Sequence, residues 1–110
     1  MVETNQFAKR LAKFWSPAEL DEFTSYIAEH PEAGDVVADT GGVRKVRWSS
    51  QCRGKRGGAR IIYFFHSAAM PLFLLDFYAK NEKNDLDSRG KKQLLMIVQT
   101  ILRKDFILPV

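Results

Sequence analysis

Cysteine is nearly absent from the sequence, where Cys52 is the only one among 110 residues. A single cysteine excludes an intrachain disulfide and any zinc site that needs several thiolates. A nucleophilic thiol also needs an activating partner such as histidine, and none lies beside Cys52 in the sequence. We therefore interpret Cys52 as a small residue at the end of a strand.

Long apolar runs are missing too. No stretch reaches the roughly 18 consecutive apolar residues of a membrane-spanning helix, and the first residues lack the apolar core of a secretory signal. The length of 110 residues and the 45% hydrophobic content suit one compact domain with a real core. The sequence thus predicts a soluble cytoplasmic protein with a single domain over residues 1–110.

The usual motifs of nucleotide and metal sites are also missing. Neither G-x-x-x-x-G-K-[ST] nor G-x-G-x-x-G occurs, so a phosphate-binding loop is not expected. His30 and His66 have no companions at metal-ligand spacing. Each remains a candidate general base, although a surface or sheet-edge role is the simpler interpretation. We expect no cofactor and no metal.

Acidic residues are absent from residues 43–60, although this stretch holds seven of the chain's 17 Lys and Arg residues. The seven are Arg44, Lys45, Arg47, Arg53, Lys55, Arg56 and Arg60. A surface built only for solubility mixes charges of both signs, whereas cations clustered on a mildly acidic body attract a polyanion. Nucleic acid is therefore the predicted partner, and a solvated run of charge is the alternative.

Apolar residues recur at helical spacing in the N-terminal part of the chain. Phe7 and Leu11 belong to such a stripe and predict one amphipathic helix. The segment SPAEL predicts the start of a second helix, because Ser16 can cap it and Glu19 can reach back to the Ser16 amide. This helix should end before Pro31. The short connection between the two predicts a helical hairpin.

The spacing changes to period two in the middle of the chain. Strands are predicted over 43–49, 59–67 and 71–80, with a short extended piece at 36–37. The brief connection before the last strand makes the final two strands adjacent and antiparallel. Helical spacing returns over 85–106. The predicted class is α+β, with a helical hairpin on a small antiparallel sheet of three to four strands and a C-terminal helix.

Strand alternation indicates which cations act together. Lys45 and Arg47 point to one side of their strand, and Arg44 points to the other with the apolar residues. Arg60 opens the next strand just after two glycines, which permit close approach of a ligand.

On the last strand, alternation places Asp76, Tyr78 and Lys80 on one face. It places the apolar residues Leu75 and Phe77 on the other face. If the three strands are neighbours, one concave surface collects the cations and the phenol. Its members are Lys45, Arg47, Arg60, Tyr78 and Lys80.

Three segments carry a resemblance to a known family. In their order and spacing, GDVVADTGGVRKVRW, GKRGGARIIYFF and LLDFYAKNEKNDL resemble the RelE/ParE superfamily of bacterial toxins, and most of all its HigB-like branch. The resemblance covers nearly the whole chain and implies an α+β fold. It implies an endoribonuclease that cuts mRNA in the ribosomal A site and so inhibits translation. It also implies a cognate antitoxin that silences the toxin.

The resemblance also implies roles for particular residues. In RelE-like members, two basic residues on one strand and an arginine at the start of the next surround the scissile phosphate. These roles fall to Lys45, Arg47 and Arg60. Tyr78 and Lys80 occupy the strand that usually supplies a further phosphate-binding cation. The remaining cations of the basic stretch are expected to bind RNA or the ribosome, and these are Arg44, Arg53, Lys55 and Arg56.

The sequence leaves the general acid and base open. Members of the family often stack a tyrosine from near the C-terminus on a base, but no tyrosine follows Tyr78. Lys45 or Lys80 is a candidate base, because neighbouring cations favour a neutral amine. Tyr78 is the second candidate. The first strand common in the superfamily is reduced here to about residues 1–3.

Three other functions remain open at this point. A ParE-like member would inhibit DNA gyrase instead of cutting RNA. A second alternative is an RNA-binding module without catalysis. A third is an inactive relative that retains only antitoxin binding.

Overall fold

The computed structural model describes residues 1–12, 15–48, 59–67, 71–79 and 87–105, apart from the side chains of residues 78, 79, 104 and 105. Three helices and five strands make up this part of the chain. In chain order they are β1 (Val2–Glu3), α1 (Asn5–Leu11), α2 (Pro17–Glu29), β2 (Asp35–Val36), β3 (Val43–Trp48), β4 (Ala59–Phe64), β5 (Phe73–Ala79) and α3 (Ser88–Asp105).

The sheet has the strand order β1-β5-β4-β3-β2. It is mixed, because β1 runs parallel to β5 while the other neighbours are antiparallel. The α+β class is confirmed, but the prediction of a purely antiparallel sheet with three to four strands is wrong. Strands β1 and β2 contain two residues each, which is too few to show an alternation of period two.

Helices α1 and α2 pack against one face of the sheet, as predicted. Phe7 of α1 and Phe23 and Ile27 of α2 are fully buried in the same core. The predicted capping box starts α2, since Ser16 Oγ accepts from the Glu19 amide (3.3 Å) and Glu19 Oε1 accepts from the Ser16 amide (2.8 Å). Local sequence signals therefore set where α2 begins, and its apolar stripe sets which side meets the sheet.

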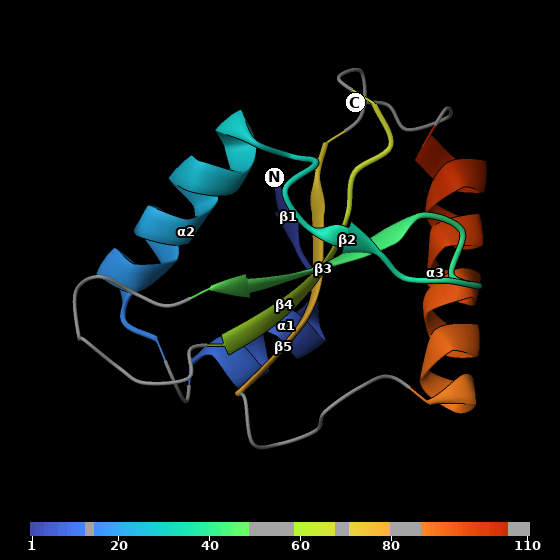
Figure 1. The fold of residues 1–110 in the computed structure, drawn as a ribbon, viewed down its shortest axis with the longest axis horizontal. Coiled ribbons are helices and arrows are strands. Elements are labelled where there is room, and N and C mark those ends of the chain that lie inside the picture. Colours follow the sequence, from blue (N-terminus) through green and yellow to red (C-terminus); the bar gives the residue numbers. More distant parts are fainter. Residues whose placement is uncertain (13–14, 49–58, 68–70, 80–86, 106–110) are drawn as a thin grey trace.

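Helix α3 covers the opposite face of the sheet, which we call the α3 face (Figure 1). Leu94 and Val98 of α3 form a second core with Val43, Ile62 and Phe64. Val43 begins β3 and Phe64 ends β4. Helix α3 therefore packs over the end of the sheet where β3 begins.

The turn before β3 fits closely under α3. Thr40 is fully buried, and its Oγ1 donates to the Val37 carbonyl (2.7 Å) and accepts from the Val43 amide (3.1 Å). Gly41 has φ +78°, and a Cβ there would lie 3.1 Å from Leu95 Cδ1 of α3. Glycine is required both by the backbone conformation and by the approach of α3.

A β-bulge in β5 changes which side chains share a face. Ile62 pairs with Asp76 and Tyr63 pairs with Leu74, so Leu75 is an extra residue. Leu75 joins the core under α3, whereas Phe77 joins the core under α1 and α2. The prediction that Leu75 and Phe77 share a face is therefore wrong, because strict alternation assumes uninterrupted pairing.

Tyr63 fixes the connection between α2 and β2 from inside the core. Its hydroxyl donates to the Pro31 carbonyl and accepts from the Gly34 amide, both at 2.8 Å. Arg44 holds the same connection, because its Nη1 donates to the carbonyls of Gly34 (2.7 Å) and Glu32 (3.3 Å). Burial raises the pKa of the Tyr63 phenol above its ordinary value of 10.0.

Replacing Tyr63 with phenylalanine is expected to lower the free energy of unfolding by about 1–3 kcal/mol, because two buried backbone groups lose their partner. Urea denaturation at pH 7 measures this loss. Tyr26→Phe is the matched control, because Tyr26 is 37% exposed. An equal effect of both substitutions would contradict the role given to the Tyr63 hydroxyl.

The raised pKa of Tyr63 adds a pH dependence to this prediction. The unfolded phenol ionises first, so the stability linked to Tyr63 is fully present below about pH 10 and is lost as the pH rises through the raised value. Tyr63→Phe should show a shallower loss of stability above pH 10.

Candidate functional site

Lys45, Arg47 and Arg60 lie together on the α3 face. In the pairing of β3 with β4, Arg47 is directly opposite Arg60, and Lys45 is opposite Ile62. Opposite residues of an antiparallel pair project to the same side with Cβ atoms about 4.5–5.5 Å apart. Ile62 is fully buried in the core under α3, so Lys45 and the Arg47–Arg60 pair also project to the α3 face. The predicted convergence of these three residues, here called the cation cluster, is confirmed.

The cation cluster is accessible at the surface. Arg47 is exposed, and Lys45 and Arg60 are half-buried. Like charges placed directly opposite each other on neighbouring strands destabilise a sheet. Within the described part of the chain, Arg47 and Arg60 have no carboxylate at ion-pair distance. Two guanidinium groups on one face can bind an anion, and their geometry suits the oxygens of a phosphate.

The sheet carries the cation cluster beside a buried core and leaves it accessible. Arg60, Ile62 and Phe64 are alternate residues of β4 and lie on the same face. Ile62, in the middle, is buried in the core and anchors the strand there. Helix α3 packs at the far end of this face, around Val43 and Phe64. Arg47 lies near the other end of β3, one residue before Trp48.

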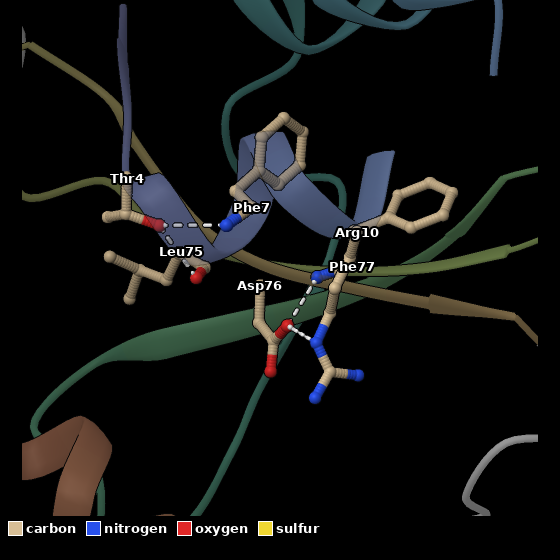
Figure 2. Close-up of polar contacts among 6 residues, drawn as sticks. All are labelled: Thr4, Phe7, Arg10, Leu75, Asp76 and Phe77. Carbon is tan, nitrogen blue, oxygen red and sulfur yellow. Dashed lines mark hydrogen bonds and ion pairs between the residues drawn. The ribbon is translucent and has the colours of Figure 1, made fainter. Parts of the chain in front are cut away.

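An ion pair that the sequence does not reveal lies on the same face of the sheet. Asp76 of β5 pairs with Ile62 of β4, and it is only 7% exposed. Figure 2 shows Asp76 Oδ1 accepting from the Phe77 amide (2.7 Å) and meeting Arg10 Nε of α1 (3.3 Å). Arg10 and Asp76 are far apart in the sequence, so no local pattern joins them.

Thr4 makes a second connection between the N-terminal segment and β5 (Figure 2). Its Oγ1 donates to the Leu75 carbonyl (3.0 Å) and accepts from the Phe7 amide at the start of α1 (3.2 Å). One hydroxyl thus caps α1 and ties it to β5. Together with the Arg10–Asp76 pair, it fixes α1 along the strand that carries Tyr78.

Among the predicted site residues of the last strand and of residues 49–58, the structure describes only the backbone of Tyr78. The backbone of Tyr78 pairs with Arg60 across β4 and β5, which puts it in the row of Arg47 and Arg60. The side chain of Tyr78 lies outside the described residues. So do Lys80 on the last strand, Cys52, and three cations of the basic stretch, namely Arg53, Lys55 and Arg56.

Arg44 is separate from the cation cluster. It pairs with Tyr63, whose side chain lies in the core under α1 and α2, so Arg44 projects to that side. Its bonds to the Glu32 and Gly34 carbonyls give it a structural role. The expectation that Arg44 also binds RNA stays a prediction.

Neither a cluster of metal ligands nor a membrane-spanning helix is found within the described residues. These residues contain no group of three or more His, Cys, Asp or Glu side chains that could hold a metal ion. Within the same residues, no helix is long and apolar enough to cross a membrane.

The family comparison agrees with this geometry. The model of a family described as the RelE toxin of the RelE / RelB toxin-antitoxin system matches residues 4–105. The match spans both layers of helices, all of the sheet except β1, and the whole cation cluster. The chain therefore belongs to the RelE toxin family.

Proposed function

We propose that this chain is a ribosome-dependent endoribonuclease that cuts mRNA and so inhibits translation. The observation that supports this most directly is the Arg47–Arg60 pair, two cations opposite each other on an open face with Lys45 beside them. Such a pair stabilises the negative charge that builds up on a phosphate during cleavage. As a member of a toxin-antitoxin system, the chain has an antitoxin as its partner.

The proposed reaction is a transesterification within the RNA. The 2′-oxygen loses its proton to a general base and bonds to the adjacent phosphorus, and the bond from phosphorus to the 5′-oxygen breaks. That oxygen takes a proton, which leaves a 2′,3′-cyclic phosphate and a 5′-hydroxyl. No oxidant, reductant or further reactant is needed.

The roles proposed for Arg47, Arg60 and Lys45 are supported by their positions on the sheet, and the other roles are supported by the family resemblance. Arg47 and Arg60 hold the phosphate oxygens, and Lys45 on the same face takes the proton from the 2′-hydroxyl. Tyr78, whose backbone pairs with Arg60, is the second candidate for proton transfer, and Lys80 is a further phosphate contact. The cations that would grip RNA or the ribosome outside the reacting centre are Arg44, Arg53, Lys55 and Arg56.

Controlled expression with 5′-end mapping tests the proposal. We expect the wild-type chain to arrest growth and to produce cuts in translated messages but not in untranslated ones. Lys45→Ala should lose both effects. Lys9→Ala removes the same charge from an exposed position on α1, so it should retain both.

The alternatives predict different results in the same experiment. Growth arrest with intact RNA would replace the nuclease with a gyrase inhibitor of the ParE type. The absence of arrest in the wild type would indicate an inactive relative. Equal activity of Lys45→Ala and Lys9→Ala would remove Lys45 from the mechanism.

A further inference from the structure

The outer side of α3 exposes apolar side chains that the sheet does not use. Met96 is 65% exposed and Ile97 is 39% exposed. Together with Thr100 and Ile101 they line a shallow hollow, and we call these four residues the outer ridge. Helical spacing groups Ile97 with Leu94 and Val98, but of these three only Leu94 and Val98 are buried in the core under α3. The outer ridge is therefore available to a partner.

Cations flank the outer ridge at both ends. Arg89 and Lys92 lie before it and Arg103 lies after it, and all three are exposed. They share the outward side with Met96, because residues three, four or seven apart lie on one side of a helix. From Ser88 to Arg103 the helix carries no acidic residue. The outward side of α3 is thus an apolar patch between positive ends.

The stability of α3 itself does not account for this charge pattern. Negative side chains stabilise the first turn of a helix, and positive ones oppose the helix dipole there. The first turn of α3 contains no acid, and Arg89, Lys91 and Lys92 lie near its start. Only Asp87, just before the helix, caps it by accepting from the Gly90 amide (2.8 Å). A negatively charged partner would offset this unfavourable arrangement.

We infer that the outer ridge and its flanking cations are a docking surface for an amphipathic, acidic helix of the antitoxin. The inference rests on the proposed function in that it takes the chain to be a toxin held by an antitoxin. The apolar side of the incoming helix covers Met96 and Ile97, and its acids meet Arg89, Lys92 and Arg103. This is recognition of a helix by an apolar groove, with charge setting the orientation.

The composition of the patch favours a protein helix over RNA. RNA is bound by cations together with aromatic or polar groups that stack on bases or contact the backbone. The described residues at the centre of this patch are instead aliphatic, with Met96 and Ile97 exposed and Ile101 partly buried, and none of them is aromatic. The patch therefore suits the apolar side of a protein helix better than it suits RNA.

Binding of the purified cognate antitoxin tests the inference by calorimetry. All toxin chains carry Arg60→Ala so that the cells producing them survive. Adding Met96→Glu and Ile97→Glu should raise the Kd by about 100-fold, because apolar contacts at the centre of an interface supply most of its binding energy. The matched control is Val36→Glu, since Val36 is an exposed apolar residue (57%) on β2 at the edge of the sheet. It should change the Kd by less than about threefold.

A charge-reversed variant supplies a second, independent readout. Arg89→Glu combined with Lys92→Glu and Arg103→Glu should weaken binding and flatten the dependence of the Kd on salt concentration. All of these positions are exposed, so thermal melting should show the fold intact.

Three outcomes would overturn the docking surface. One is an equal Kd for the ridge variant and Val36→Glu. Another is an unchanged Kd with a lower melting temperature, which would mean that the outer ridge stabilises the fold and does not bind the antitoxin. The third is that charge reversal impairs mRNA cleavage in a chain with Arg60 intact but leaves antitoxin binding unchanged, which would make α3 an RNA surface. The binding measurement uses chains with Arg60→Ala and does not depend on mRNA cleavage. A failure of the nuclease proposal would therefore be distinguishable from a failure of the docking surface.

Discussion

Replacing Arg60 with alanine is expected to slow mRNA cleavage on programmed ribosomes by about 100- to 1000-fold. This is the range seen when one preorganised donor to a developing negative charge is removed. Arg60 is half-buried on a strand whose residue Ile62, two positions later on the same face, is fully buried, so the backbone that carries Arg60 is anchored in the core. Single-turnover rates at saturating toxin measure the effect on the chemical step.

The pairing of Arg60 with Arg47 makes a second expectation specific to this structure. Because the two residues are directly opposite each other, they should act on the same phosphate, and their effects should not add. Arg47→Ala should also cause a large loss. The double variant should be slower than either single variant by much less than the product of the two effects.

Arg60→Lys is the conservative control for this prediction. It keeps the positive charge but loses the planar fork that binds two phosphate oxygens, so it should recover only part of the rate. Full activity of Arg60→Lys would show that only the net charge matters. Strictly additive losses at Arg47 and Arg60 would show that the two side chains bind different phosphates.

The members of the cation cluster could be predicted from the sequence because local alternation indicates which side of a strand each residue faces. Lys45 and Arg47 are two residues apart on a strand with a clear pattern, and Arg60 begins a strongly apolar strand. The sequence does not reveal the register of β3 and β4, which places Arg47 opposite Arg60. Register depends on contacts across the whole sheet, so only the structure could supply it.

The parts of the fold that the sequence did not predict have a common physical cause. The bulge at Leu75, the parallel pairing of β1 with β5 and the contact of Arg10 with Asp76 all depend on segments that meet only after folding. A bulge leaves no mark in the pattern of apolar residues, and a two-residue strand has no period. The same reasoning explains Ile97, whose helical spacing fits a core position but which is exposed because α3 contacts the sheet along a narrow stripe.

Asp76→Ala is expected to lower the free energy of unfolding by about 2–4 kcal/mol, of which hydrogen bonding to a charged group contributes most and the ion pair the rest. The Asp76 carboxylate is 10% exposed, and it accepts from the Phe77 amide inside its own strand as well as from Arg10 of α1. The loss should appear as a lower urea midpoint with an unchanged slope, because the size of the folded core does not change.

Two comparisons separate the contributions at Asp76. Asp76→Asn keeps an oxygen acceptor for the Phe77 amide and loses the charge, so it should cost clearly less than Asp76→Ala. A double-mutant cycle with Arg10→Ala should give a coupling energy of about 0.2–1 kcal/mol, because the Arg10 side chain is 37% exposed and solvent screens the pair. If Asp76→Asn were as destabilising as Asp76→Ala, the charge and not the hydrogen bond would hold β5 in place. A coupling energy near zero would mean that Thr4, whose hydroxyl bonds to the Leu75 carbonyl, fixes α1 on β5 without help from Arg10.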